Sequence, residues 1–309
     1  MTGTSIPSKT LQFISAEKLG GGEEQIVRRT SFLYHYTSPS GAEGILQQDG
    51  LAFWFTRIDC FQDTMEGKDV IQNYRVVCEQ LREDRTIDQA FFDHVADLKP
   101  LGQNFFLDPS VERRAFGGDG EAYVCCFCME EDSPYMWSEY AKDREGKGYM
   151  FKISYTAFQG RQKKGNSRVR FRPVLYSDAE KQDKIRRLLL AYFDDWRKGN
   201  ELVNADVVRY MLSWWQYFFK SESFREENEV RAVLILPKDH TQWDRDCTYY
   251  EFPKPHIVYS LVKGYLRGIK ASPHNTPGET QRLLAEANKR GYHLPRRERT
   301  DLEAAAFVK

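Results

Sequence analysis

The stretch that decides how this chain is interpreted is Phe224-Arg225-Glu226-Glu227-Asn228-Glu229-Val230-Arg231-Ala232-Val233-Leu234-Ile235-Leu236. Its second half is apolar and rich in β-branched residues, which predicts a buried strand. Alternate residues of a strand share a face, so Glu227, Glu229 and Arg231 are expected to point the same way. Two carboxylates beside one guanidinium form a polar cluster, in which Glu229 is the strongest functional candidate. A solvated strand end with a local ion pair is the alternative, because such pairs are common and weak.

Hydrophobic patterning predicts a series of strands before this cluster. Residues 133–141 are expected to form a helix capped by Ser133 with Pro134 in its first turn, and Ser177 is expected to cap a later helix. Gly50 is expected to close a short helix. The predicted strands cover residues 32–38, 51–56, 123–129 and 148–153. Between and after them, helices are expected at 41–50, 65–83, 87–98, 177–196, 207–219 and 277–290, and further strands near 248–252 and 262–271.

Several of these blocks together resemble the bacterial domain of unknown function 2971 family over about residues 32–273. They are Tyr34-His35-Tyr36-Thr37, Asp63 with Glu66, Cys126-Phe127 with Met136-Trp137-Ser138, and Phe224-x-x-Glu227-x-Glu229-x-Arg231. The chain departs from the family pattern where Gln62-Asp63-Thr64 replaces an Asn-Asp-Pro triplet and Phe224 replaces a tryptophan.

The order of motifs also resembles the ADP-ribosyltransferases of the His-Tyr-Glu type. That resemblance implies an α+β fold with a split, mostly antiparallel sheet and helical insertions, and NAD as substrate. It places Glu229 as the catalytic carboxylate, because a carboxylate stabilises the oxocarbenium charge that develops when nicotinamide leaves. It places Glu227 as the group that orients or deprotonates the acceptor. The implied NAD-binding residues are His35, Tyr36, Thr37, Phe55, Trp137, Tyr140 and Arg231. The implied acceptor of ADP-ribose is a protein or a nucleic acid, and such an activity suits a toxin or defence role.

Purely structural roles also fit several of these residues. His35 fits a core histidine, and Trp137 and Tyr140, three apart on a helix, fit core packing. Asp63 and Glu66 fit helix caps. At the level of function, the alternatives are a catalytically silent module that binds a nucleotide or a partner, and a nuclease-like enzyme holding Mg²⁺ with four acids: Asp63, Glu66, Glu227 and Glu229. No metal is expected, because Arg231 already neutralises the glutamates.

Composition limits the function classes. The chain has 309 residues, and its 45 Lys and Arg balance 45 Asp and Glu, which removes the global electrostatic case for a nucleic-acid or membrane binder. A basic segment at 161–172 is interpreted as a solvated loop leading into a strand, and the alternative is a patch that docks a substrate such as a nucleic acid. With no secretory h-region and no long apolar run, a cytoplasmic protein is expected.

The chain has six cysteines, and three of them lie on one expected strand: Cys125, Cys126 and Cys128. This arrangement suits reduced cysteines on a buried strand better than a zinc site.

The expected organisation is one catalytic domain with extensions. Residues 1–30 form an N-terminal extension, and residues 31–275 form a single α+β domain with helical insertions near 65–115 and 177–220. Residues 276–309 form a C-terminal helix and tail.

Overall fold

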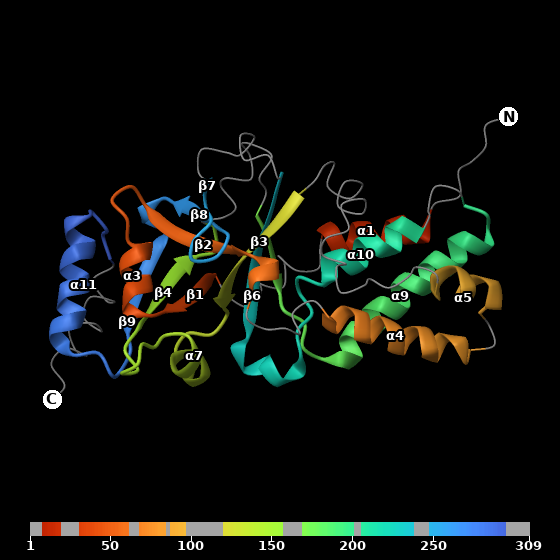
Figure 1. Ribbon diagram of the computed structural model, residues 1–309, viewed down its shortest axis with the longest axis horizontal. Coiled ribbons are helices and arrows are strands. Elements are labelled where there is room, and N and C mark those ends of the chain that lie inside the picture. Colours follow the sequence, from red (N-terminus) through yellow and green to blue (C-terminus); the bar gives the residue numbers. More distant parts are fainter. Residues whose placement is uncertain are drawn as a thin grey trace. The chain divides into compact units, whose positions relative to one another are not determined.

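The computed structural model describes residues 8–19, 31–61, 68–84, 87–96, 120–156, 169–200, 205–237 and 247–294. The chain divides into two compact units (Figure 1). The helical unit is built from residues 1–24, 61–120 and 174–225, and the sheet unit from residues 25–60, 121–173 and 226–309. Both stretches expected as helical insertions therefore contribute to the helical unit.

The helical unit consists of amphipathic helices that bury one face each. They are α1 (Lys9–Leu19), α4 (Lys68–Arg82), α5 (Gln89–Ala96), α9 (Asp178–Arg197) and α10 (Ala205–Trp215). In α4 the residues Val70, Tyr74, Val77 and Leu81 are buried, and this spacing gives a single apolar stripe. The helix α9 begins as expected at Ser177, whose side chain accepts a hydrogen bond from the Glu180 amide.

Two buried charges join helices within this unit. Lys181 of α9 is fully buried, and its Nζ lies 2.6 Å from Oδ2 of Asp69 on α4 and 2.9 Å from Oδ1 of Asp178. Asp195 Oδ2 accepts from Ser8 Oγ at 2.8 Å and from the Thr10 amide at 2.9 Å, so this α9 carboxylate caps the start of α1. Burial by itself raises the pKa of Asp195, but the surrounding donors outweigh it and lower the pKa to about 2.

The sheet unit contains nine strands in one sheet among the described residues. The strands are β1 (Phe32–Thr37), β2 (Leu51–Arg57), β3 (Gly120–Cys128), β4 (Tyr149–Ser154), β5 (Arg170–Pro173), β6 (Glu229–Pro237), β7 (Cys247–Tyr250), β8 (His256–Leu261) and β9 (Leu266–Ala271). Their order is β7-β8-β2-β3-β1-β4-β9, with β6 paired to β3 and β5 paired to β6. The ladders β1–β4, β2–β8, β4–β9 and β5–β6 are antiparallel. The expected α+β class with a mostly antiparallel sheet is confirmed.

The two faces of this sheet carry different clusters. Leu33 of β1 and Val230, Ala232 and Leu234 of β6 belong to the main core, which α3 (Pro39–Ile45) and α11 (Pro277–Lys289) complete. The alternate residues Tyr34 and Tyr36 belong instead to a smaller cluster with Cys128 and Met150, onto which α7 (Pro134–Glu139) packs through Met136 and Trp137. Figure 1 shows α3, α11 and α7 around the strands of this unit.

Short 3-10 helices complete the described elements, at Ile58–Cys60, Glu222–Glu227 and Lys263–Tyr265. Cysteine sulfurs form no disulfide in the described part of the chain, and Cys125 and Cys128 are buried on β3 as expected. No helix among the described residues has the length and apolar content needed to cross a bilayer.

Several predicted elements needed correction. The short helix after β1 ends at Ile45, before Gly50, and the strand expected from residue 262 begins at Leu266, after a 3-10 turn. The strand β8 was not predicted, and neither was α1 within the N-terminal extension. In α1 the reason is tertiary, because the helix begins against the distant carboxylate of Asp195.

Candidate functional site

The prediction that Glu227, Glu229 and Arg231 share one strand face is wrong for Glu227, because Glu227 lies before the strand. It ends the 3-10 turn Glu222–Glu227, whereas β6 begins at Glu229. Asn228 between them has φ +43°, a left-handed conformation that asparagine tolerates better than most residues. Its carbonyl accepts a 3.0 Å hydrogen bond from the Met129 amide at the end of β3. The left-handed residue therefore ends the strand alternation just ahead of Glu229.

Glu229 and Arg231 do share a face of β6, and they form a buried ion pair. Arg231 Nε donates to Glu229 Oε1 at 2.9 Å, and Arg231 Nη2 donates to Glu229 Oε2 at 3.2 Å. Glu229 is 4% exposed and Arg231 1% exposed. The bidentate geometry fixes the carboxylate in one orientation, which a solvated strand end would not do.

Glu227 is tied to an aromatic residue that reaches solvent. Tyr140, the C-cap residue of α7, donates from its hydroxyl to Glu227 Oε1 at 2.7 Å. The ring is 45% exposed, whereas Glu227 is 2% exposed. Burial and the neighbouring charges of Glu227 and Glu229 raise the pKa of Tyr140 well above its ordinary value, so the phenol stays protonated and keeps donating.

Cys126 of β3 is the site residue that sequence reasoning missed. Burial and then the charge of Glu229 raise the pKa of its thiol well above the ordinary value, and Arg231 acts in the opposite direction. The thiol is therefore neutral and a poor nucleophile. The available signal was strand alternation, which separates Cys126 from the core residues Cys125 and Phe127. We call Tyr140, Glu227, Glu229, Arg231 and Cys126 the carboxylate site.

His35 lies outside the carboxylate site. Its ring packs edge-on against Phe53 with centroids 5.3 Å apart and lies 5.6 Å from Phe127, and both phenylalanines belong to the main core. His35 Nδ1 lies 3.0 Å from the Cys126 carbonyl, which can only accept, so Nδ1 carries the proton. Burial lowers the pKa of His35 and keeps the ring neutral. Because Glu229 alternates with the core residue Val230, the structure places His35 and Glu229 on opposite faces of the sheet.

The other predicted NAD-binding residues are also separated. Phe55 is fully buried in the main core against Tyr259, so it offers no free face to a ligand. Tyr36 and Trp137 pack together edge-on at 5.0 Å, and Trp137 Nε1 donates to Asp132 Oδ1 at 2.7 Å. Thr37 is the half-buried last residue of β1. Of the predicted set, the structure brings together Tyr140, Glu227, Glu229 and Arg231.

The two acids proposed for a metal site lie outside the described residues, since the structure describes neither Asp63 nor Glu66. In the part of the chain that is described, no cluster of three His, Cys, Asp or Glu side chains is arranged to hold a metal ion.

Part of the chain matches a known protein family. Residues 136–232 match the family described as "Protein of unknown function (DUF2971)". The predicted family resemblance is thus confirmed over a segment that holds Tyr140, Glu227, Glu229 and Arg231 of the carboxylate site. No curated protein and no solved structure matches the chain.

Proposed function

We propose that the protein is an NAD-consuming ADP-ribosyltransferase whose substrate binds against Tyr140, beside the carboxylates of Glu227 and Glu229. The observation that carries this proposal is the hydrogen bond between an exposed phenol and a buried carboxylate. An exposed aromatic ring offers a flat surface to the cationic nicotinamide ring of NAD. A flat ligand that stacks on the Tyr140 ring would therefore lie close to the buried carboxylates of Glu227 and Glu229.

The proposed chemistry uses the buried charge. When the bond between nicotinamide and ribose breaks, positive charge moves onto the sugar, and a preorganised carboxylate stabilises that charge more strongly than it stabilises the ground state. Glu229 has the role of this carboxylate, because Arg231 holds it in a fixed orientation. A carboxylate oxygen has further acceptor capacity, so it can also accept from a ribose hydroxyl. Glu227 then orients the attacking group of the acceptor.

Charge balance favours sugar chemistry over metal binding at this site. Two glutamates and one arginine leave a formal charge of one negative unit, and the arginine occupies both oxygens of Glu229. We therefore expect full activity in excess EDTA. Restoration of activity only by Mg²⁺ or Mn²⁺ would instead indicate the nuclease-like alternative.

The test is release of nicotinamide from NAD by the full-length chain. Glu229→Gln should reduce the rate by about a hundredfold or more, because the amide keeps the shape but loses the charge. Glu226→Gln is the matched control, since Glu226 is an exposed neighbour in the same turn and its variant should cleave NAD at the wild-type rate. A Glu229→Gln rate within threefold of wild type, in a folded protein, would refute the assignment.

A catalytically silent binding module is the second candidate, and specific observations favour it. His35 packs in the core, and Glu229 is already paired through both oxygens. On this alternative NAD or another nucleotide binds against Tyr140 without release of nicotinamide. Calorimetry and product analysis on the same sample separate the two, and Tyr140→Ala, which removes the ring, should weaken binding in both cases. If the transferase activity is found, we propose that the protein is cytoplasmic and that a protein or a nucleic acid accepts the ADP-ribose. A toxin or defence role would suit this activity.

A further inference from the structure

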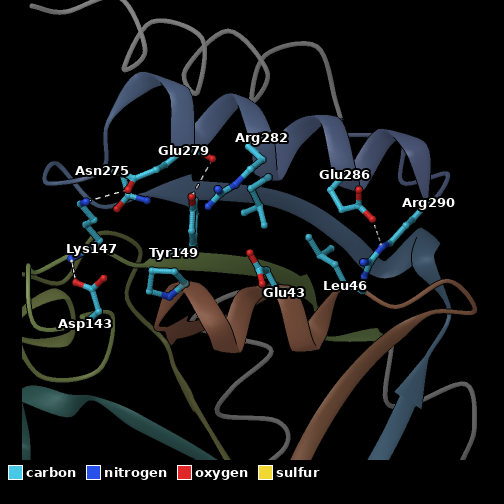
Figure 2. A pocket seen from close by; sticks show the side chains of 12 residues that line it. Glu43, Leu46, Asp143, Lys147, Tyr149, Asn275, Glu279, Arg282, Glu286 and Arg290 are labelled. Carbon is cyan, nitrogen blue, oxygen red and sulfur yellow. Dashed lines mark hydrogen bonds and ion pairs between the residues drawn. The ribbon is translucent and has the colours of Figure 1, made fainter.

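A pocket lies in the sheet unit, and it is separate from the carboxylate site. It occupies about 460 Å³, a volume suited to a small molecule. Figure 2 shows α3 on one side of it and α11 on the other, with Tyr149 of β4 between them. Leu46, Leu283 and Pro39 supply apolar surface, and no residue of the carboxylate site lines it.

Most charged groups around this pocket are already paired. Lys147 Nζ lies 2.8 Å from Glu279 Oε1, and Arg290 Nε lies 2.7 Å from Glu286 Oε1. Asp143 accepts the backbone N–H groups of Glu145 and Lys147 at 2.8 and 3.0 Å. These contacts form the two ends of the pocket in Figure 2 and leave its middle to other residues.

Two opposite charges remain in the middle. Glu43 projects from α3 and Arg282 from α11, on opposing walls (Figure 2). Within the described residues neither side chain has a hydrogen bond or an ion pair. Burial raises the pKa of Tyr149, and of the two charges Glu43 raises it and Arg282 lowers it, so both lie near the Tyr149 hydroxyl. The carboxylate and the guanidinium face the same pocket from opposite walls.

Two neutral groups lie beside this pair of charges. Tyr149 Oη donates to the Glu279 carbonyl at 3.2 Å, which leaves its oxygen able to accept. Asn275 Oδ1 accepts from the Gly148 amide at 2.9 Å. The Asn275 amide nitrogen is buried and has no acceptor within hydrogen-bonding geometry, but it lies close enough to the Tyr149 hydroxyl to lower the pKa of that group. Buried donors are normally satisfied, and a ligand oxygen placed next to Tyr149 is suited to accept from this one.

We propose that this pocket binds a free α-amino acid, with its ammonium group on Glu43 and its carboxylate on Arg282. A guanidinium binds a carboxylate through two parallel hydrogen bonds, and a carboxylate accepts from an ammonium. The apolar contribution of Leu46 and Leu283 fits an apolar side chain, so L-leucine is the first probe. This site does not depend on the proposed transferase activity.

The experiment is calorimetric titration of the full-length protein with L-leucine. We expect saturable binding, and a loss of affinity of tenfold or more in Glu43→Gln and in Arg282→Gln. N-acetyl-L-leucine, which lacks the ammonium group, and L-leucinamide, which lacks the carboxylate, should each bind at least tenfold more weakly. Gln281→Ala is the matched control, because Gln281 is exposed on α11 and does not line the pocket.

Both variants replace exposed side chains, so melting curves should show them folded. Equal affinity of wild type and both variants would overturn the proposal, as would equal binding of the acetylated or amidated probe. Absence of binding by leucine and by every other standard amino acid would also overturn it. In that case Glu43 and Arg282 are exposed charges that are hydrated by solvent.

Discussion

The helical unit and the sheet unit both bury charged side chains, but they use them differently. In the helical unit Lys181 connects α9 to α4, and Asp195 connects α9 to α1. In the sheet unit the Glu229–Arg231 ion pair is formed by two residues of the same strand. It lies near the exposed Tyr140, whose pKa the charge of Glu229 helps to raise. The helical unit thus uses buried ion pairs and hydrogen bonds to join helices, whereas the sheet unit holds a buried ion pair beside the proposed ligand site.

The largest expected effect concerns these buried pairs. Arg231→Met should lower the free energy of unfolding by about 3–5 kcal/mol, because it leaves the buried Glu229 carboxylate without its cation. Lys181→Met should lower it by a smaller amount, because Asp69 is only half-buried and Asp178 is exposed. Urea denaturation measures both. Only Arg231→Met should also change NAD cleavage per folded molecule. An equal change of activity in both variants would remove the contrast between the units.

The double variant Glu229→Leu with Arg231→Met sharpens the same comparison. Replacing both partners by apolar side chains should recover most of the lost stability, since no unpaired charge remains. NAD cleavage should stay absent in this stable protein. Recovery of cleavage together with stability would mean that the pair serves the fold alone.

A smaller effect is expected at Asp195. Asp195→Asn should destabilise the helical unit by roughly 2–3 kcal/mol, because charge-assisted hydrogen bonds are replaced by weaker ones. The folded pKa of about 2 lies below the ordinary value of 3.8, so this stabilisation is present above about pH 4 and is lost as the pH falls toward 2. Denaturation curves across this range test it. Asp194→Asn is the control, because Asp194 is a partly exposed neighbour whose ion pairs should contribute less than about 1 kcal/mol.

The sheet unit should respond to acid at a higher pH through His35. Burial lowers its pKa below the ordinary 6.5, so its contribution is complete above pH 6.5 and declines as the pH falls through the folded pKa. His35→Phe should cost about 1–2 kcal/mol at pH 7, by removing the hydrogen bond to the Cys126 carbonyl, and should abolish this decline. Hydrogen exchange of β1, corrected for intrinsic rates, measures it. The control is His274→Asn, because His274 is exposed and lies outside β1 and the main core.

The smallest expected effect is at the helix caps. Ser177→Ala at α9 and Ser133→Ala at α7 should each cost about 1 kcal/mol. Only Ser133→Ala should also reduce NAD cleavage, because α7 positions Tyr140. Ser223→Ala, at an exposed position, should change stability by less than about 0.5 kcal/mol. Unchanged cleavage in Ser133→Ala would show that Tyr140 is placed independently of this cap.

Much of the local structure could be predicted from the sequence. The strands β1, β2 and β4 and the helices α7, α9 and α11 lie close to their expected positions, because each has a clear period of apolar residues. The caps Ser133 and Ser177 were predicted for the same reason, since they precede such a period. Where a segment is stabilised by distant partners, as in α1 and β8, local patterning gave no signal.

The candidate site was only partly predictable. The sequence by itself determined that Glu229 and Arg231 share a face, since the strand period is fixed by backbone geometry. It also placed Trp137 and Tyr140 on one helix. Only the tertiary structure decided which face each strand turns toward the core, which separated His35 from Glu229 and brought Tyr140 to Glu227. The physical reason is that strand pairing and the left-handed turn at Asn228 depend on contacts between segments far apart in the chain.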